Sequence, residues 1–503
     1  MLDPAPRFDP RRRAAVTVAL ILVTALASFE STVVSTAMPT IIGDLSGLPL
    51  YSWVFSAYLL ASTITMPLFG RLADIHGRRR VLLSAIVIFL TGAGACACAR
   101  SMPQLIAARG LQGLGAGGLL PIALTVSGDL FTLRERARIQ GIFSGVWGVA
   151  SLVGPLLGAA MTLAFGWRSI FSINLPLGAI AFALVLTQMR ESRAPLADPF
   201  DAKGGAALAV GVASLLVATL HGPGLALRLG LMVVAVAALF AFARIQSSHE
   251  HPLVPPSLFR RSETAAPYAA GLLLGTTIYG VDAFVPLFVQ GARGGTAAAA
   301  GAVVTPVVLM WAVSAALAAR AVVAFGFRRT ARTGALLIGL GFVALIAAVM
   351  LDAGVPWISA ACALVGAGLG PSSMSQVLAI QAEAPERERG VATSLVPFFR
   401  TVGGALGVSA LGGILSAGLE HRLGAAAQAA SQVLAGPHAP GAVAAGPSGA
   451  VREAIEASLL PVFVALFVLA LVNLWITRRF PGAVRSRETE GLGEAAPRAE
   501  EMM

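Results

Sequence analysis

The sequence predicts an all-α membrane protein built from fourteen transmembrane helices. Of its 503 residues, 56% are hydrophobic and only 12% are charged, and the mean hydropathy is +0.80. A soluble domain carries about 25% charged residues, so most of this surface is not in contact with water. Apolar runs of about 18 or more residues recur along the whole chain, and each is long enough to cross a membrane as a helix.

The predicted spans follow one another with short connections. In order they are 14–38, 51–69, 81–99, 103–126, 139–165, 169–187, 204–220, 225–242, 265–289, 297–319, 333–351, 356–380, 391–417 and 459–476. With the N-terminus in the cytoplasm, 28 of the 36 Lys and Arg residues fall on the inside and only six on the outside, as the positive-inside rule requires. We therefore predict a multi-pass protein of the cytoplasmic membrane with both termini cytoplasmic.

Other classes of protein are disfavoured by motifs that the sequence lacks. The net charge of +11 is spread over short loops without interleaved aromatic residues, so no nucleic-acid partner is expected. The three cysteines lie in apolar stretches, and no His/Cys cluster predicts a metal site. No P-loop or catalytic motif is present, so we predict neither an enzyme nor an ATP-driven pump, and no cofactor.

A repeated pattern divides the chain into two halves. Residues 70–80 recur at 319–329 with an offset of 249, and residues 107–115 recur at 360–368 with an offset of 253. Transporters are often built from such repeats, with the substrate site between them. The predicted organisation is a cytoplasmic tail (1–13), a six-helix bundle (14–189), an inserted helix pair with its loops (190–263), a second six-helix bundle that includes an external loop at 420–456 (264–477), and a second cytoplasmic tail (478–503).

Five short motifs follow one another in the first half. They are ExTVVxxAMP at 30–39, GRLADIHGRR at 70–79, LxxxRxxQGxGA at 105–116, a Gly/Pro pattern at 141–159 and WRxxFxxNxPxG at 167–178. Together they resemble the fourteen-helix drug:proton antiporters of the major facilitator superfamily, although Glu30 replaces a common aspartate and Ile75 a usual basic residue. The resemblance covers nearly the whole chain and implies the major facilitator fold.

The resemblance also implies a function. It indicates proton-coupled efflux of hydrophobic or amphipathic small molecules by alternating access, with the proton gradient as the energy source and no cofactor. The expected partners are a small-molecule substrate, protons and membrane lipid, and the expected state is a monomer. A dedicated exporter of one natural product, lipid or metabolite, a proton-coupled importer and an uncoupled facilitator remain open alternatives.

Two acids well inside the spans, Glu30 and Asp282, are the candidates for proton coupling. A carboxylate at bilayer depth is costly, and a desolvated carboxyl group holds a proton more readily than a hydrated one. Arg109 lies one helical turn from Gln112, and the resemblance implies that it takes part in coupling, with Glu30 as a candidate partner. A permanent, purely structural ion pair is the alternative.

A substrate cavity is expected between the halves. Tyr268, Gly275, Tyr279, Asp282 and Pro286 share one helical face, and rings beside an acid suit amphipathic cations. The residues predicted to line the cavity are Gln112, Tyr58, Trp147, Tyr279, Trp311, Phe399 and Arg400. Core packing is an equally open interpretation of the aromatic residues, and a structural role is equally open for Arg400.

Two further motifs concern conformational change. By resemblance, Gly70, Asp74, Gly77 and Arg78 form a latch that stabilises one conformation, with Arg138 or Arg136 as the predicted partner of the acid. Val323 stands in the place of Asp74 in the second half, so the latch should be one-sided; a solvated loop is the alternative. Gly141, Gly154, Pro155 and Gly158 match an antiporter motif, and the proline should kink its helix.

Overall fold

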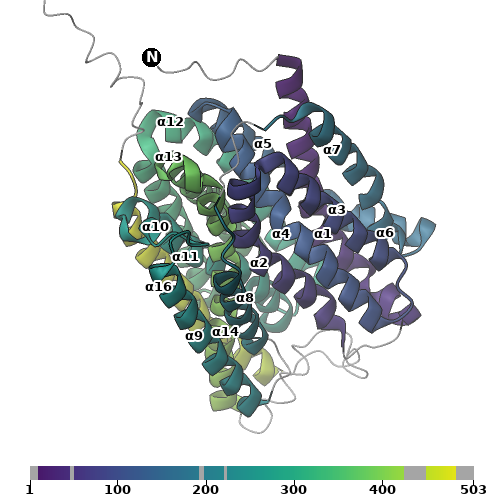
Figure 1. Ribbon diagram of the computed structural model, residues 1–503. Coiled ribbons are helices and arrows are strands. Elements are labelled where there is room, and N and C mark those ends of the chain that lie inside the picture. The colour runs from purple at the N-terminus through teal and green to yellow at the C-terminus, as the bar shows by residue number, and fades with distance from the viewer. Residues whose placement is uncertain (1–9, 46–49, 192–197, 220–223, 424–448, 483–503) are drawn as a thin grey trace, which may run out of the picture.

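The computed structural model describes residues 10–45, 50–191, 198–219, 224–423 and 449–482. Every regular element in these ranges is helical, which confirms the predicted all-α class (Figure 1). The predicted external loop 420–456 and the tail 478–503 lie largely outside the described residues. We refer to α1–α7 as the first half and to α11–α16 as the second half.

The first half contains five long helices, a short one and a medium one. They are α1 (Pro10–Leu45), α2 (Tyr51–His76), α3 (Arg78–Ala97), α4 (Met102–Leu130), α5 (Leu133–Phe165), α6 (Ser169–Ser172) and α7 (Asn174–Gln188). Between the halves lie α8 (Ala202–Thr219), α9 (Leu225–Ser248) and the short α10 (Ser257–Arg260). The positions of α8 and α9 match the predicted inserted pair.

The second half begins with α11 (Ser262–Leu287), which continues into the π-helical turn η2 (Phe288–Ala292). It goes on with α12 (Ala297–Met350), α13 (Val355–Glu383), η3 (Glu386–Glu388), α14 (Arg389–Leu423), α16 (Gly449–Ile476) and η5 (Thr477–Arg479). In the described residues, twelve helices are long and apolar enough to cross a membrane, or thirteen if the bent α5 is one span.

The long helix α12 contains two arms. Its 54 residues would extend about 80 Å at the α-helical rise, more than twice the thickness of a hydrocarbon core. Gly326 interrupts it with φ 80° and ψ 170°, a conformation that a residue with a side chain rarely adopts. The break lies where the sequence predicts a loop between two spans. A total of fourteen spans remains a prediction.

The break at Gly326 has a counterpart in the first half. Gly77, which separates α2 from α3, has φ 94° and ψ 146°, close to the values at Gly326. These two glycines occupy equivalent positions in the repeat predicted from the sequence. The helix that follows each glycine is capped by a segment that comes after the last helix of the same half.

The two caps use different chemistry. The Glu191 carboxylate, just beyond α7, accepts the backbone N–H groups of Arg78 at 2.6 Å and Arg79 at 3.2 Å. In the second half, the Pro481 carbonyl accepts the backbone N–H of Arg328 at 3.2 Å. Exposed N–H groups at a helix start need such acceptors. A charged cap in one half thus corresponds to an uncharged cap in the other.

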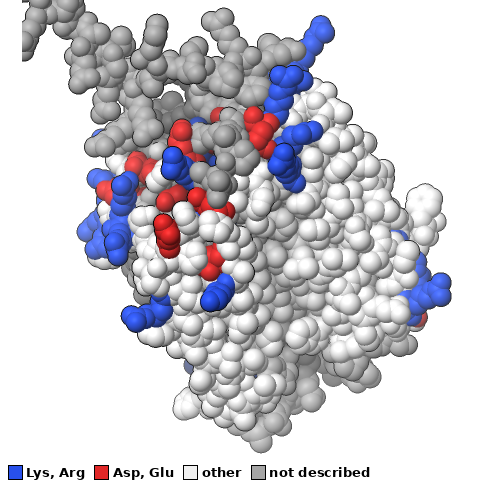
Figure 2. Space-filling model, viewed as in Figure 1, with Lys and Arg blue, Asp and Glu red and all other residues white. Residues whose placement is uncertain are grey.

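Charged side chains gather at one end of the molecule, above a broad uncharged flank (Figure 2). We call this end the basic face; it carries the two glycine junctions, the start of α14 and the end of α16. The uncharged flank is apolar, and α9 is the clearest case, with Val233 69% and Phe240 67% exposed. Helices with exposed apolar surface of this extent are suited to contact lipid.

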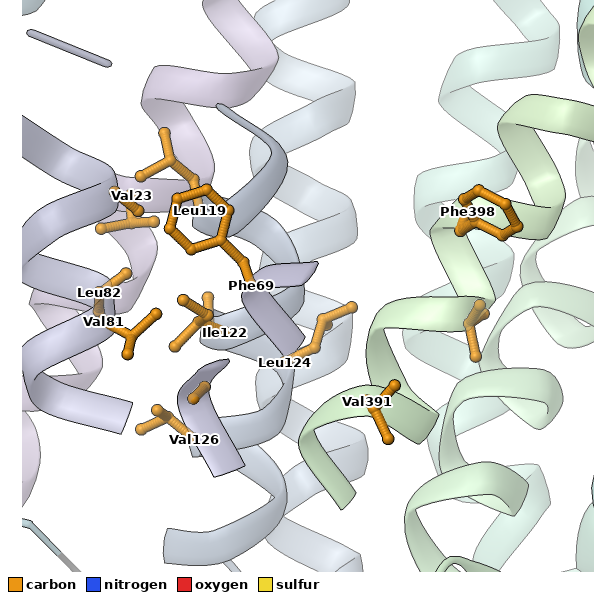
Figure 3. Close-up of a cluster of buried hydrophobic side chains, with 14 of the residues drawn as sticks. Val23, Phe69, Val81, Leu82, Leu119, Ile122, Leu124, Val126, Val391 and Phe398 are labelled. Atoms are coloured by element: carbon orange, nitrogen blue, oxygen red, sulfur yellow. The ribbon is translucent and has the colours of Figure 1, made fainter. Parts of the chain in front are cut away.

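The hydrophobic core crosses from one half to the other. Val23, Phe69 and Leu119 belong to one buried cluster with Val391 and Phe398 of α14. Figure 3 shows the side chains of α14 facing those of the first-half helices. Much of the contact between the halves is therefore apolar and not directional. The polar contacts described below determine how the two halves are aligned with each other.

At the opposite end, the Asp44 carboxylate joins α1 to the start of α6. It accepts hydrogen bonds from the Trp167 indole N–H and an Arg168 guanidinium N–H, both at 2.9 Å. These two bonds, the indole bond first, lower the pKa of Asp44 below its ordinary value of 3.8.

Candidate transport site

The acid Glu30 lies at the centre of a buried polar cluster inside the first half. One carboxylate oxygen pairs with the Arg109 guanidinium. The other accepts N–H groups from the side-chain amides of Gln112 at 2.8 Å and Asn174 at 3.1 Å. The cluster joins α1, α4 and α7, and none of its four members is more than 3% exposed.

The arginine of this cluster is held on all sides. Its NH1 group also donates to the Gln112 side-chain oxygen at 2.8 Å, and its Nε donates to the Val54 carbonyl at 3.2 Å. The Tyr58 ring lies 4.3 Å from the guanidinium carbon. A buried ion pair is tolerated when further hydrogen bonds satisfy both charges, and these contacts meet that condition.

The structure brings the predicted residues Glu30, Arg109 and Gln112 together. It adds Asn174 to them and corrects the position expected for Gln112. Sequence reasoning proposed Glu30 as a partner of Arg109, and the two are in direct contact. Asn174, the asparagine of the motif at 167–178, is not among the predicted site residues, yet it donates to Glu30. Gln112 was predicted to line a cavity, but it is fully buried and bonded to Glu30.

The second predicted coupling acid, Asp282, lies elsewhere. It is exposed on α11, and Tyr279, one turn away, is 37% exposed. No hydrogen bond or ion pair between described residues joins Asp282 to the Glu30 cluster. The Tyr279 ring fits against Gly404 of α14, where a Cβ would lie 2.0 Å from the ring. Asp282 is therefore accessible to solvent beside the contact between α11 and α14, one turn from Tyr279.

Near the N-terminal end of α11, the helical face that carries Asp282 is packed against other parts of the protein. Tyr268 was predicted to share a cavity wall with Asp282, but it is only 2% exposed, and its hydroxyl donates to the Ala392 carbonyl at 2.9 Å. Its ring packs against those of Phe399 and Phe259, with centroids 5.4 Å and 5.6 Å away. Tyr268 and Phe399 thus belong to a closed aromatic contact near the basic face.

The other residues predicted to line a cavity are half-buried. Trp147 on α5 and Trp311 on α12 are both partly exposed, and the Trp311 indole donates to the Ser373 hydroxyl at 3.2 Å. Arg400 on α14 donates to the Gln376 side-chain oxygen at 3.5 Å. Its buried Nε has no hydrogen-bond partner among the described residues. The structure therefore leaves Arg400 without a carboxylate partner in the part of the chain it describes.

The predicted latch acid, Asp74, joins the two halves at the basic face. It is 1% exposed and pairs with Arg78 at 2.8 Å. It also accepts the backbone N–H groups of Gly390 at 3.0 Å and Val391 at 2.9 Å, at the start of α14. A carboxylate is favoured at a helix start because the free N–H groups and the helix dipole both stabilise negative charge.

Further contacts reinforce this junction, and sequence reasoning missed them. Asp129, at the end of α4, accepts from Arg78 at 3.1 Å and from Arg389 of the second half at 2.9 Å. The Gln381 side-chain amide of α13 donates to the Leu124 carbonyl of α4 at 2.9 Å. The bonds made by Arg389 and Gln381 connect the halves, so the basic face is closed in this conformation.

The predicted arginine partner of Asp74 is a different residue. Arg138 is exposed on α5, and the arginine that pairs with Asp74 is Arg78. Gly70 contributes by close approach: a Cβ there would lie 2.2 Å from the Ser394 hydroxyl oxygen and 2.9 Å from the Gly390 carbonyl oxygen. Only a glycine lets α2 come this near to α14.

The antiporter motif lies along α5. This helix bends by 49° between Gly154 and Leu156, as predicted from the proline at 155. Gly141 brings α5 against α12, where its Cβ would lie 3.4 Å from the Ala316 Cα. Gly154 and Gly158 are both buried. The α5–α12 contact is thus a second junction between the halves.

Comparison with known proteins identifies the family. A family model described as the Major Facilitator Superfamily matches residues 20–408. The multidrug transporter protein MdtP of Bacillus subtilis (strain 168) is 35% identical over 413 residues, 81% of this chain and 76% of that protein. Multidrug resistance protein 3 of the same strain is 30% identical over 402 residues, 79% of this chain and 78% of that protein.

Solved structures share the fold at low identity. The human organic anion transporter MFSD10 matches with a TM-score of 0.64 and 16% identity, over 93% of this chain and all of that chain. The proton:xylose symporter XylE matches with a TM-score of 0.60 and 15% identity, over 93% of this chain and 96% of that chain. The family model and the relative at 35% identity show that the chain belongs to the Major Facilitator Superfamily and is a multi-pass membrane transporter, not an enzyme.

Proposed function

We propose that this transporter exports hydrophobic or amphipathic small molecules in exchange for protons, by alternating access. The curated relatives at 30–35% identity are named as a multidrug transporter and a multidrug resistance protein, which supports efflux. Proton exchange is inferred from the Glu30–Arg109 pair. Glu30 is a buried acid inside a membrane transporter, and it is bonded to Arg109, Gln112 and Asn174.

The proposed coupling step follows from charge. Protonation of Glu30 would remove the negative charge that balances Arg109, leaving a buried cation without a partner. That state is relieved if the helices around Arg109 move so that water or an anionic group reaches the guanidinium. Deprotonation restores the pair. The two protonation states therefore favour different helix arrangements, which is what coupling requires.

The conformation described here supports an assignment of the two access states. The basic face is closed by Asp74, Asp129 and Gln381, whereas Asp282 and Tyr279 are exposed farther along α11. We assign this arrangement to the state in which the basic face is shut. Substrate would enter after that face opens, and protons would arrive from the opposite side, with Asp282 nearest to them.

The available energy is sufficient for concentrative export. One proton entering down a potential of about 100 mV provides roughly 2.3 kcal/mol, and each pH unit adds about 1.4 kcal/mol. The sum supports a substrate gradient of several hundredfold. The proposal places the chain in the cytoplasmic membrane as a monomer, with the basic face and both termini in the cytoplasm, and requires no cofactor.

The test is transport of an ethidium-like dye into inverted vesicles that contain the full chain. Uptake should require a proton gradient and stop when a protonophore is added. Glu30→Gln should abolish gradient-driven uptake, and Asp282→Asn should weaken it. Asp198→Asn is a matched control, because Asp198 pairs with Arg71 outside the predicted spans. Uptake that survives the protonophore, or full coupled transport by Glu30→Gln, would refute the proposal.

A further inference from the structure

Two arginines lie well inside the predicted spans, and they differ in how their charge is balanced. Arg109 pairs with the Glu30 carboxylate in the buried cluster described above. Arg400 on α14 pairs with no carboxylate among the described residues. Its NH2 group donates to the neutral Gln376 side chain at 3.5 Å, longer than an ordinary hydrogen bond, and its buried Nε has no acceptor there. A guanidinium group at bilayer depth is costly without an anion, so this one is suited to bind an anion from outside the protein.

Arg400 lies where the closed junction ends. It is eleven residues from the start of α14, about 16 Å along the helix axis from the basic face. The preceding residue, Phe399, packs in the closed aromatic contact with Tyr268, whereas Arg400 itself is only half-buried. Gly275 brings α11 against this point, because a Cβ there would overlap the Arg400 carbonyl oxygen. The guanidinium is therefore held beside the α11–α14 contact, next to the part of the protein that is shut.

The side chains around this guanidinium offer neutral polar groups and ring surface. Ser373, one turn before Gln376 on α13, accepts the Trp311 indole N–H at 3.2 Å. The Trp311 ring on α12 is half-buried, and the Tyr279 ring on α11 is 37% exposed. Partly exposed rings of this kind suit the aromatic body of an amphipathic molecule. One positive charge bordered by such rings matches an aromatic molecule that carries a negative group.

Asp282 does not supply that negative group in this conformation. It lies seven residues beyond Gly275, about 10 Å along α11, and no ion pair joins it to Arg400 within the described residues. A carboxylate on a ligand accepts two parallel N–H groups from a guanidinium, a geometry that lysine does not offer. We propose that Arg400 selects substrates that carry a carboxylate on an aromatic body. This inference rests on the proposed export function and names its substrate class as organic anions, whereas rings beside an acid alone would predict cations.

The experiment compares three fluorescent probes that share one aromatic body, on the purified full chain. Dansylglycine carries a carboxylate, dansylglycinamide an uncharged amide and dansylcadaverine an ammonium group, and binding is followed by the rise in dansyl fluorescence. Wild type should bind dansylglycine about tenfold more tightly than the amide, as one charge-assisted hydrogen bond predicts, and dansylcadaverine no more tightly than the amide. Arg400→Gln should bind dansylglycine and the amide equally. Arg400→Lys should keep part of the preference, because it keeps the charge but not the planar pair of donors.

The matched control is Arg329→Gln, which removes an exposed arginine outside the predicted spans and should keep the wild-type preference. Equal affinity of wild type for dansylglycine and its amide would overturn the proposal without any variant. An unchanged preference in Arg400→Gln would overturn the assignment to this residue.

Transport separates this inference from the proposed function. In inverted vesicles, Arg400→Gln should lose gradient-driven uptake of dansylglycine and keep that of the ethidium-like dye. Loss of both would mean that Arg400 supports the fold or the coupling, and it would overturn a role in selecting substrates. The binding measurement uses no proton gradient. Preferred binding of dansylglycine without gradient-driven uptake of either probe by wild type would support the site and refute the proposed proton-driven export.

Discussion

Replacing Asp74 by asparagine should open the basic face. The substitution keeps the shape of the side chain but removes the charge that faces two backbone N–H groups of α14 and the Arg78 guanidinium. Asparagine has a single oxygen acceptor, so it cannot serve both N–H groups as the carboxylate does. At least one charge-assisted hydrogen bond between the halves is therefore lost.

The magnitude follows from the value of such bonds. A hydrogen bond to a charged group contributes about 1.5–3 kcal/mol, so we expect a shift of about 2–3 kcal/mol toward the open basic face. This corresponds to a change of about 30- to 160-fold in the ratio of closed to open molecules. Arg389 keeps its bond to Asp129, so the junction should be weakened but not abolished.

The assay is a distance measurement between spin labels on the two halves. Arg80 on α3 and Arg387 in η3 are both exposed at the basic face, so cysteines there can be labelled without disturbing the core. The native cysteines Cys96, Cys98 and Cys362 are first replaced. In Asp74→Asn, the longer of the distances sampled by wild type should become dominant.

A matched control has the same chemical change in a contact that does not join the halves. Asp198→Asn removes the partner of Arg71 at 3.1 Å, where the carboxylate is 28% exposed. It should leave the distance distribution as in wild type. If Asp74→Asn and Asp198→Asn gave the same distribution, Asp74 would not hold the basic face closed, and the reasoning would be wrong.

Three other predictions concern single contacts. Glu30→Gln should lower the thermal stability because it leaves the Arg109 guanidinium buried without a carboxylate, at a cost of about 3–5 kcal/mol; Glu30→Gln/Arg109→Met should recover most of the loss in a fluorescence melting assay. Gly70→Ala should separate α2 from α14 and increase labelling at the basic face, and adding Ser394→Gly should partly reverse this, since the new Cβ meets the Ser394 hydroxyl. The hydrogen bond between Asp44 and the Trp167 indole should persist as the pH falls to the ordinary carboxyl pKa, and it should be lost only below that pH. The reason is that the pKa of Asp44 is lowered in the folded protein, so the stabilisation by its carboxylate is lost only as the pH falls through this lower value. Tryptophan fluorescence is followed from pH 7 into the acid range, and a loss of the contact above the ordinary carboxyl pKa would contradict this expectation.

The sequence was a good guide to features that depend on local pattern. An apolar run of about 20 residues is a local signal, so the long helices fall where they were predicted. An isolated charge inside such a run is also conspicuous, and this indicated Glu30 and Arg109 as candidates for an ion pair. The equivalence of Gly77 and Gly326 followed from the repeat, and both adopt positive φ.

Features that depend on tertiary packing were not predictable in the same way. Asp129 and Arg389 meet across 260 positions of sequence, and each lies at a helix end where charge is unremarkable. Arg138 lies at the correct end of α5, but the phase of the helix turns it outward. Tyr268 and Asp282 share a helical face, yet 14 residues correspond to about 21 Å along the axis, so one is buried in the closed junction while the other is exposed.

The start of α3 and the start of the second arm of α12 have different caps, so they should respond differently when the chain is shortened. The Pro481 carbonyl is an uncharged backbone acceptor that serves one N–H group, whereas the Glu191 carboxylate is a side-chain acceptor that serves two. The uncharged cap instead depends on chain continuity. A truncation placed before Pro481 would leave the second arm of α12 without its acceptor, while one placed after Pro481 would keep this contact.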